Sequence, residues 1–394
     1  MPWEKLTVCE QRLKFIYLYL ENEISLSRLC IEFGISRTTG YKLINRYCDF
    51  GVDGLKDVSR APHSHPNEVS EKVKDEIIQF RTNHPYWGAK KLKVNYERTN
   101  AGVRWPAASS IGNILRSNGL VSKRKFRNKA NVTSTLTDSS GANDVWAADF
   151  KGQVMLNDNT LCYPFTLSDH ASRMILCCRG QKSTSINSVK PIMVATFMEN
   201  GLPKFIRTDN GLPFASSGYC GLSRLSAWWI RLGITPERIT PGKPQQNGRH
   251  ERMHRVLKEE AMAVKYDNLK EHQKAFDRFV YEYNNERPHE ALGMKVPSDL
   301  YERSPREYPL IEPKVEYGES MITRYVKTNG TMNWKGNLIF VSEVIASDHV
   351  ALEQVDEKHL IVYYGHVAIG VLDESKKHML NVKDAKVLIE QFKY

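Results

Sequence analysis

Three carboxylates in this 394-residue chain occupy positions from which they could act together on a phosphate. Asp149 lies inside the apolar run VWAADF, Asp209 ends the run FIRTD, and Glu251 follows the loop PGKPQQNG. A charge within a buried strand is costly unless it reaches solvent or binds a cation. Because like charges repel one another, such a trio would need divalent metal ions to coexist.

The chemistry that three carboxylates and two metal ions favour is in-line displacement at phosphorus. Two ions about 3.5–4 Å apart activate the attacking oxygen and stabilise the leaving oxygen. Magnesium suits this role because it prefers carboxylate oxygen and water as ligands. We therefore expect two Mg²⁺ ions as cofactors, for which Mn²⁺ can substitute.

Each of these carboxylates also has an ordinary explanation. Asp149 is then a common strand aspartate, Asp209 caps a turn, and Glu251 is a favourable acid in the first turn of a helix. Other acidic residues compete for the same roles: Asp169, Glu259 and Glu260. Taken one at a time, the residues leave these alternatives open.

The helix predicted over residues 249–263 has two different faces on a wheel of 100° per residue. Met253, Leu257 and Ala261 form an apolar stripe, which indicates a buried face. The opposite face carries Glu251 followed by basic residues, which suit an approaching phosphodiester; a solvated face is the alternative. The candidate DNA contacts on this helix are Arg252, His254, Arg255 and Lys258.

The elements that must position these residues alternate between strands and helices. Residues 145–156, 160–170 and 171–180 are rich in β-formers and predict a three-stranded antiparallel meander. A helix over residues 185–201, a strand ending near Asp209 and a helix over residues 223–233 follow. This order predicts an α/β domain, a mixed sheet with helices outside it. Residues 319–394 alternate in short apolar runs, which predicts a small all-β barrel.

The basic charge of the chain is concentrated in its first third. The formal net charge is +11, and residues 1–130 hold 23 Lys and Arg against 13 Asp and Glu. The remaining residues hold 33 against 32. Such an asymmetry indicates a separate module for a polyanion, with nucleic acid as the leading candidate.

The first part of this basic region predicts a helix-turn-helix. Gly34 separates two short helices, and Ser36 can cap the second, with Tyr41, Ile44 and Tyr47 facing inward. The outer face of the second helix is placed to meet phosphates and base edges in a major groove. An ordinary helical hairpin with a solvated basic face is the alternative. The outer residues are Arg37, Thr38, Lys42 and Arg46.

A second helical set follows the linker-like residues 57–68. Its third helix starts near Pro106 and ends at Gly119, with Ile111 and Leu115 inward. We expect this set to be a second helix-turn-helix that ends in a basic tether along the DNA backbone. The expected DNA contacts are Ser110, Asn113, Arg116, Lys123, Arg124 and Lys125.

Several separate motifs occur in one order: WAADFKG, IRTDNGLPF, PGKPQQNGRHERMHRVLKEE and YNNERPHEALG. Over about residues 144–305 they resemble the integrase core of bacterial insertion-sequence transposases with a DDE triad. That group belongs with retroviral integrases in the ribonuclease-H-like superfamily. The resemblance implies a ribonuclease-H-like core whose catalytic residues and metal ligands are Asp149, Asp209 and Glu251.

Two departures from the retroviral pattern bear on the site. Here 41 residues separate Asp209 from Glu251, more than in retroviral integrases, but the NGRHER setting still favours Glu251 over Glu259. The retroviral zinc-binding His/Cys module is absent, and helix-turn-helix units take its place, so no zinc is implied.

The function implied by the resemblance is transposition. The protein would bind the terminal inverted repeats of its element, cleave DNA at the element end and join the released 3′-hydroxyl to target DNA, as at least a dimer on DNA. Two alternatives are a catalytically decayed DNA-binding regulator and a ribonuclease-H-type nuclease. The expected domains are residues 1–56, 57–130, 131–305 and 306–394.

The location expected for this protein is the bacterial cytoplasm, in association with the nucleoid. The seven cysteines form no CxxC pair, which is typical of reduced thiols. The N-terminal residues show no apolar segment of a signal peptide, and no run of 18 apolar residues predicts a membrane span.

Overall fold

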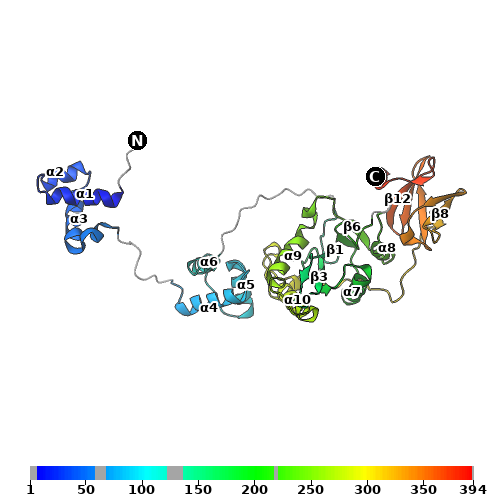
Figure 1. The fold of residues 1–394 in the computed structure, drawn as a ribbon, viewed down its shortest axis with the longest axis horizontal. Helices are drawn as coiled ribbons and strands as arrows, with labels where there is room; N and C mark the ends of the chain where they lie inside the picture. Colours follow the sequence, from blue (N-terminus) through cyan, green and yellow to red (C-terminus); the bar gives the residue numbers. More distant parts are fainter. Residues whose placement is uncertain (1–6, 58–67, 122–135, 217–220, 393–394) are drawn as a thin grey trace. The chain divides into compact units, whose positions relative to one another are not determined.

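The computed structural model of the protein describes residues 7–57, 68–121, 136–216 and 221–392. Contacts divide the chain into two compact units, Met1–Ser70 and Glu71–Tyr394 (Figure 1). None of the described helices combines the length and apolarity that a membrane crossing needs.

The first unit is a set of short helices around one apolar core. They are α1 (Val8–Leu20), α2 (Leu26–Glu32), α3 (Arg37–Phe50) and the 3-10 helix η1 (Gly51–Leu55). Gly34, with φ of +64°, makes the turn between α2 and α3. Ser36 Oγ accepts a hydrogen bond of 3.1 Å from the Thr39 amide and caps α3. The predicted helix-turn-helix is confirmed.

The buried stripe of α3 differs from the prediction by one position. Tyr41, predicted to face inward, is 57% exposed, whereas Leu43 and Ile44 are buried. The reason is Gly40, where an added Cβ would lie 2.6 Å from Cys30 Sγ. Since α3 approaches α2 most closely at this glycine, the inward stripe begins at Gly40.

The second unit starts with a three-helix module packed around Trp87 and Trp105. Its helices are α4 (Glu71–Asn83), α5 (Ala89–Thr99) and α6 (Ala108–Ser117), and α6 lies within the span predicted for the third helix. Asn95 Nδ2 donates a hydrogen bond of 2.7 Å to the carbonyl oxygen of Glu286, at the end of α10 (Leu269–Asn285). Arg98 forms a two-pronged ion pair with Asp299. These contacts fasten the module to the α/β core that follows it.

The core is a mixed six-stranded sheet. Its strands are β1 (Val145–Phe150), β2 (Val154–Met155), β3 (Leu161–Asp169), β4 (Ile175–Gln181), β5 (Phe205–Thr208) and β6 (Thr235–Arg238). The strand order is β2-β3-β1-β5-β6, with β4 paired to β3. Strands β1, β3 and β4 are antiparallel, as the meander predicts, while β5 and β6 run parallel to β1.

Helices cover both faces of this sheet. Trp146 of β1 and Phe165 of β3 share one apolar cluster with α7 (Ile186–Asn200) and α8 (Arg224–Arg231). The other face packs against α10 and α9 (Gly248–Glu260), which follows the 3-10 helix η2 (Pro244–Asn247). Because strand side chains alternate between faces, Asp149 lies on the α9 side of β1. The predicted α/β arrangement is confirmed.

The C-terminal region is rich in sheet. An antiparallel sheet in the order β13-β12-β11-β10-β7 and a hairpin of β8 and β9 make up its described strands. The 3-10 helices η3 (Glu290–Leu292) and η4 (Pro297–Asp299) precede it. Its elements are β7 (Ile322–Tyr325), β8 (Thr331–Trp334), β9 (Asn337–Phe340), η5 (Glu343–Ile345), β10 (His349–Gln354), β11 (His359–Tyr364), β12 (Val367–Asp373), β13 (His378–Met379) and α11 (Val382–Phe392). The helix α11 departs from the all-β prediction, and closure into a barrel stays a prediction.

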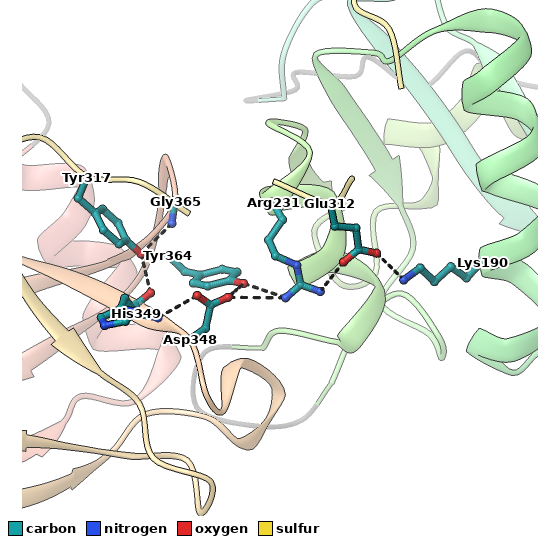
Figure 2. Close-up of polar contacts among 8 residues, drawn as sticks. All are labelled: Lys190, Arg231, Glu312, Tyr317, Asp348, His349, Tyr364 and Gly365. Carbon is teal, nitrogen blue, oxygen red and sulfur yellow. Dashed lines mark hydrogen bonds and ion pairs between the residues drawn. The ribbon is translucent and has the colours of Figure 1, made fainter. Parts of the chain in front are cut away.

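The C-terminal region shares an apolar core with α8. Ile230 of α8 belongs to the same buried cluster as Val350 and Tyr364. Figure 2 shows Arg231 between Glu312 and Asp348: its Nη2 lies 3.7 Å from Glu312 Oε2, and its Nη1 lies 3.8 Å from Asp348 Oδ2. The same Nη1 donates a hydrogen bond of 3.0 Å to Tyr364 Oη. Tyr364 Oη in turn donates to Asp348 Oδ2 at 2.6 Å.

Gly365 tests this attachment, because it has φ of +57° and an added Cβ would lie 2.8 Å from Ile230 Cγ2. We expect Gly365→Ala to lower stability through backbone strain of about 1–2 kcal/mol and crowding of about 1–3 kcal/mol. Gly336 is the matched control: it has φ of +81° and open space around the added Cβ. Thermal unfolding should show a larger drop for Gly365→Ala than for Gly336→Ala; equal drops would show that Ile230 does not constrain this position.

Candidate active site

Asp149 and Asp209 lie on neighbouring parallel strands. Ala147 of β1 pairs with Arg207 of β5, so Asp149 and Asp209 each follow that pair by two residues. The carboxyl ends of parallel strands meet at one edge of a sheet, which is where α/β proteins collect ligands. Both carboxylates line one open pocket, together with Phe150, Leu212 and Phe214.

The first turns of α9 are held beside Asp149 by hydrogen bonds to β3. Thr166, the register partner of Asp149 on β3, places its Oγ1 2.8 Å from His250 Nε2 and 2.7 Å from His254 Nε2. Ser168 Oγ lies 2.7 Å from His250 Nδ1. Glu251 follows His250 directly on α9 and is exposed.

The three predicted carboxylates share one electrostatic environment. Burial first, then the negative charge of Asp209 and, more weakly, that of Glu251 raise the pKa of Asp149 to about 7. Within the described residues, none of the three forms an ion pair with lysine or arginine. Unneutralised carboxylates on a partly buried pocket are the donor set that magnesium prefers, so the residues fit a divalent oxygen-binding metal.

The closest cluster of ligand atoms is not the predicted triad. Ligand atoms of Asp149, His250 and His254 all lie within 4.8 Å of one another. Both imidazoles are buried, and burial lowers the pKa of His250 to about 3 and moves the pKa of His254 far below its usual value. This cluster was not predicted from the sequence, although two histidines four residues apart on one helix are a recognisable pattern.

The prediction that His254 contacts DNA is wrong. Its side chain is only 3% exposed and lies against Thr166, with Nδ1 3.6 Å from Asp149 Oδ2. The wheel places His254 on the polar face of the helix. Its imidazole can nevertheless be buried, because it forms a hydrogen bond with the hydroxyl of Thr166. The other candidate contacts on this helix are exposed, and their contact with DNA stays a prediction: Arg252, Arg255 and Lys258.

The three competing acids have other surroundings. Asp169 is buried and accepts hydrogen bonds from the Asn143 and Ser172 amides, so it closes a loop. Glu260 forms an ion pair with Arg287 at the end of α9. Glu259 is exposed on α9, two turns beyond Glu251. Asp169 and Glu260 thus have structural roles away from the pocket. Asp209 also accepts a hydrogen bond of 3.0 Å from the Gly211 amide, so it caps its turn as well as lining the pocket.

The candidate DNA contacts of the helical modules divide into three groups. The exposed ones are Arg37, Thr38 and Lys42 on α3, with Asn113 and Arg116 on α6. Two others are half-buried: Ser110, and Arg46, whose guanidinium donates to the Lys56 carbonyl and so turns toward its own unit. Lys123, Arg124 and Lys125 lie outside the described residues.

The raised pKa of Asp149 predicts a pH-dependent stability in metal-free buffer. An unfolded aspartate ionises near pH 4, whereas folded Asp149 keeps its proton to about pH 7. The free energy of unfolding should therefore fall as pH rises through this window. Asp149→Asn removes the titrating group, so we expect it to be more stable than the wild type at pH 8, by roughly 1–3 kcal/mol. Chemical denaturation with a chelator present measures this.

Glu259→Gln is the control for that comparison, because it removes an exposed carboxylate from the same helix. It should follow the wild-type pH profile. Parallel profiles for wild type and Asp149→Asn would contradict the assigned environment of Asp149.

The sequence of this chain matches family models of an integrase core and of helix-turn-helix domains. Two family models described as "Integrase core domain" match residues 139–244 and 232–297. A "Helix-turn-helix domain" matches residues 11–63, and a "Homeodomain-like domain" matches residues 39–115. The integrase matches cover the sheet and α9, and the other two cover the helical modules.

Two curated proteins encoded by insertion elements are similar to this chain. The chain is 23% identical over 238 residues to an uncharacterised insertion element IS407 protein of Burkholderia multivorans, covering 60% of this chain and 82% of the relative. It is 26% identical over 180 residues to an uncharacterised insertion element IS476 protein of Xanthomonas euvesicatoria, covering 45% and 50%.

Two solved structures also align. The HTLV-2 integrase catalytic core in complex with magnesium aligns with TM-score 0.33 and 15% identity, covering 42% of this chain and 100% of that chain. A simian T-cell lymphotropic virus intasome with a PP2A regulatory subunit aligns with TM-score 0.37 and 18% identity, covering 74% and 97%. The sequence matches combine an integrase core with preceding helix-turn-helix domains, and the relatives are encoded by insertion elements. These matches support a bacterial insertion-sequence transposase of the integrase superfamily.

Proposed function

We propose that this protein is a DDE transposase that cuts DNA at the ends of its insertion sequence and joins the ends to target DNA. The observation that carries the proposal is the geometry of the acids. Asp149 and Asp209 stand at the carboxyl ends of parallel neighbours, Glu251 stands on α9 beside them, and no lysine or arginine of the described chain pairs with them. Such a group is suited to metal ions that contact a phosphodiester.

In the proposed reaction, water attacks the phosphodiester at the element end, and the bond to the 3′ oxygen breaks and leaves a 3′-hydroxyl. That hydroxyl then attacks a phosphodiester of target DNA. Two Mg²⁺ ions, held by Asp149, Asp209 and Glu251 when bound, supply activation of the attacking oxygen and stabilisation of the leaving one. Manganese can substitute for magnesium.

The residues of the chain itself hold and orient the DNA. The exposed cations of α9, Arg252, Arg255 and Lys258, can contact the backbone phosphates near the acids. The helix α3 presents Arg37 and Lys42 to the inverted repeat, in the position of a recognition helix. Two ends must be joined together, so we propose at least a dimer on DNA.

The proposed division of labour follows the expected domains. Residues 1–56 and 57–130 bind the inverted repeats, residues 131–305 perform the chemistry, and residues 306–394 form a barrel-like domain. Because the proposed substrate is chromosomal DNA, we propose that the protein acts in the bacterial cytoplasm, in association with the nucleoid.

Substitution of each acid tests the proposed chemistry. Asp149→Asn, Asp209→Asn and Glu251→Gln should each abolish Mg²⁺-dependent nicking of labelled end DNA, a loss of at least about 100-fold. Binding of the same DNA should survive, because the helical modules are untouched. Glu259→Gln is the matched control and should retain nicking. Nicking retained in any of the three variants would exclude that residue, and wild-type binding without any nicking would favour a decayed regulator.

The role of α3 is tested by salt-dependent binding. Each phosphate contact that is removed should lower the slope of log affinity against log salt by about 0.9. We therefore expect Arg37→Ala and Lys42→Ala to weaken binding of end DNA and to flatten this slope. Lys14→Ala removes an exposed cation from α1 of the same unit and should change neither quantity. Equal effects of all three variants would contradict a recognition role for α3.

A further inference from the structure

The hydroxyl of Thr166 has three polar neighbours, and together they fix the hydrogens of the buried histidine pair. Thr166 Oγ1 lies 3.1 Å from the carbonyl oxygen of Asp149, 2.8 Å from His250 Nε2 and 2.7 Å from His254 Nε2. A hydroxyl donates one hydrogen bond and accepts two. A carbonyl oxygen only accepts, so the hydroxyl donates to Asp149, and both imidazoles must donate their Nε2–H to Thr166.

This count of hydrogens leaves the other nitrogen of each neutral imidazole with a lone pair. For His250 that lone pair is used, because Ser168 Oγ lies 2.7 Å from Nδ1 and donates to it. For His254 it is not used by any hydrogen bond of the described residues. The Nδ1 atom of His254 instead faces Asp149 Oδ2 at 3.6 Å.

A distance of 3.6 Å is too long for a hydrogen bond, so no proton bridges the two atoms directly. It is close to the separation of two ligands on one metal ion. Ligand atoms that each lie about 2.1 Å from an ion are about 3–3.5 Å apart. A nitrogen lone pair and a carboxylate oxygen that face each other across such a gap are a usual pair of metal ligands.

We infer that His254 Nδ1 is a nitrogen ligand of the same divalent ion that Asp149 binds. The inference rests on the proposed metal-dependent function and adds a fourth side chain to the three carboxylates. His250 has no such role, since both of its nitrogens are engaged with β3; it is a positioning residue that holds α9. The positions of the hydrogens thus distinguish the two histidines: His254 is a metal ligand and His250 is a positioning residue.

The chemical consequence is a preference among metals. Imidazole nitrogen binds ions later in the Irving–Williams order more strongly, whereas Mg²⁺ gains little from it. A site made of carboxylates alone would show a smaller difference in affinity between Mn²⁺ and Mg²⁺. The chain should therefore bind Mn²⁺ more tightly than Mg²⁺, and that difference should depend on His254.

Pulsed electron paramagnetic resonance of Mn²⁺ bound to the full chain tests the assignment without DNA or turnover. A directly bound imidazole produces ¹⁴N modulation of the Mn²⁺ echo. We expect this modulation in the wild type, its loss in His254→Asn and its retention in His250→Asn, the equally buried neighbour one turn away. Calorimetric titration should show about tenfold weaker Mn²⁺ binding in His254→Asn, with Mg²⁺ affinity changed by less than about threefold.

The outcomes separate this inference from the proposed function. Mn²⁺ that binds to the wild type and is lost in Asp149→Asn, but shows no nitrogen modulation, would overturn the ligand role of His254 and leave the metal-dependent function standing. No Mn²⁺ binding by the wild type would overturn both. Modulation that persists in His254→Asn would also overturn the assignment. The wild-type spectrum decides the matter even if a variant fails to fold.

Discussion

The burial of one carboxylate is the constraint on which the centre of this protein depends. Asp149 cannot withdraw from the sheet, because β1 lies between β3 and β5 and its own carbonyl oxygen accepts a hydrogen bond from Thr166. Burial and the negative charge of Asp209 both raise its pKa, so a nearby cation would favour its ionised form. The short parallel strand β5 and the helix α9 bring the other acidic groups to the same place, which makes a metal ion the natural counter-charge.

The positions of the acids could be predicted from the sequence because they depend on local features. Asp209 follows a strand, Asp149 lies in one, and Glu251 begins a helix, so each location follows from where an element starts or stops. The buried histidines could not be predicted in this way. The partner of His254 is Thr166, 88 residues away, and a helical wheel carries no information about a hydroxyl on a distant strand. Arg46 likewise turns to a carbonyl of its own unit, which its exposed position on a wheel does not reveal.

Outside the site, too, local features of the fold could be predicted from the sequence, whereas contacts between distant segments could not. Alternating runs predicted the C-terminal strands, but sheet closure depends on pairing between distant strands. The final helix α11 was included in the same all-β prediction, although its apolar residues have a helical spacing. The apolar character of α8 is informative in retrospect. Trp228, Trp229 and Ile230 are all buried, because α8 packs on the sheet with one side and on the C-terminal region with the other. Consecutive apolar residues in a helix point to different sides, so such a run predicts two packing partners and not one.

The helix α9 shows why directional contacts are suited to this site. One side of the helix packs through Met253 and Leu257, contacts that tolerate small shifts. His250 and His254 instead hold it by imidazole–hydroxyl hydrogen bonds, whose strength falls steeply with angle and distance. Groups that bind metal ions must be placed to within about 0.5 Å. Hydrogen bonds at the start of the helix therefore hold Glu251 more tightly than apolar packing alone would.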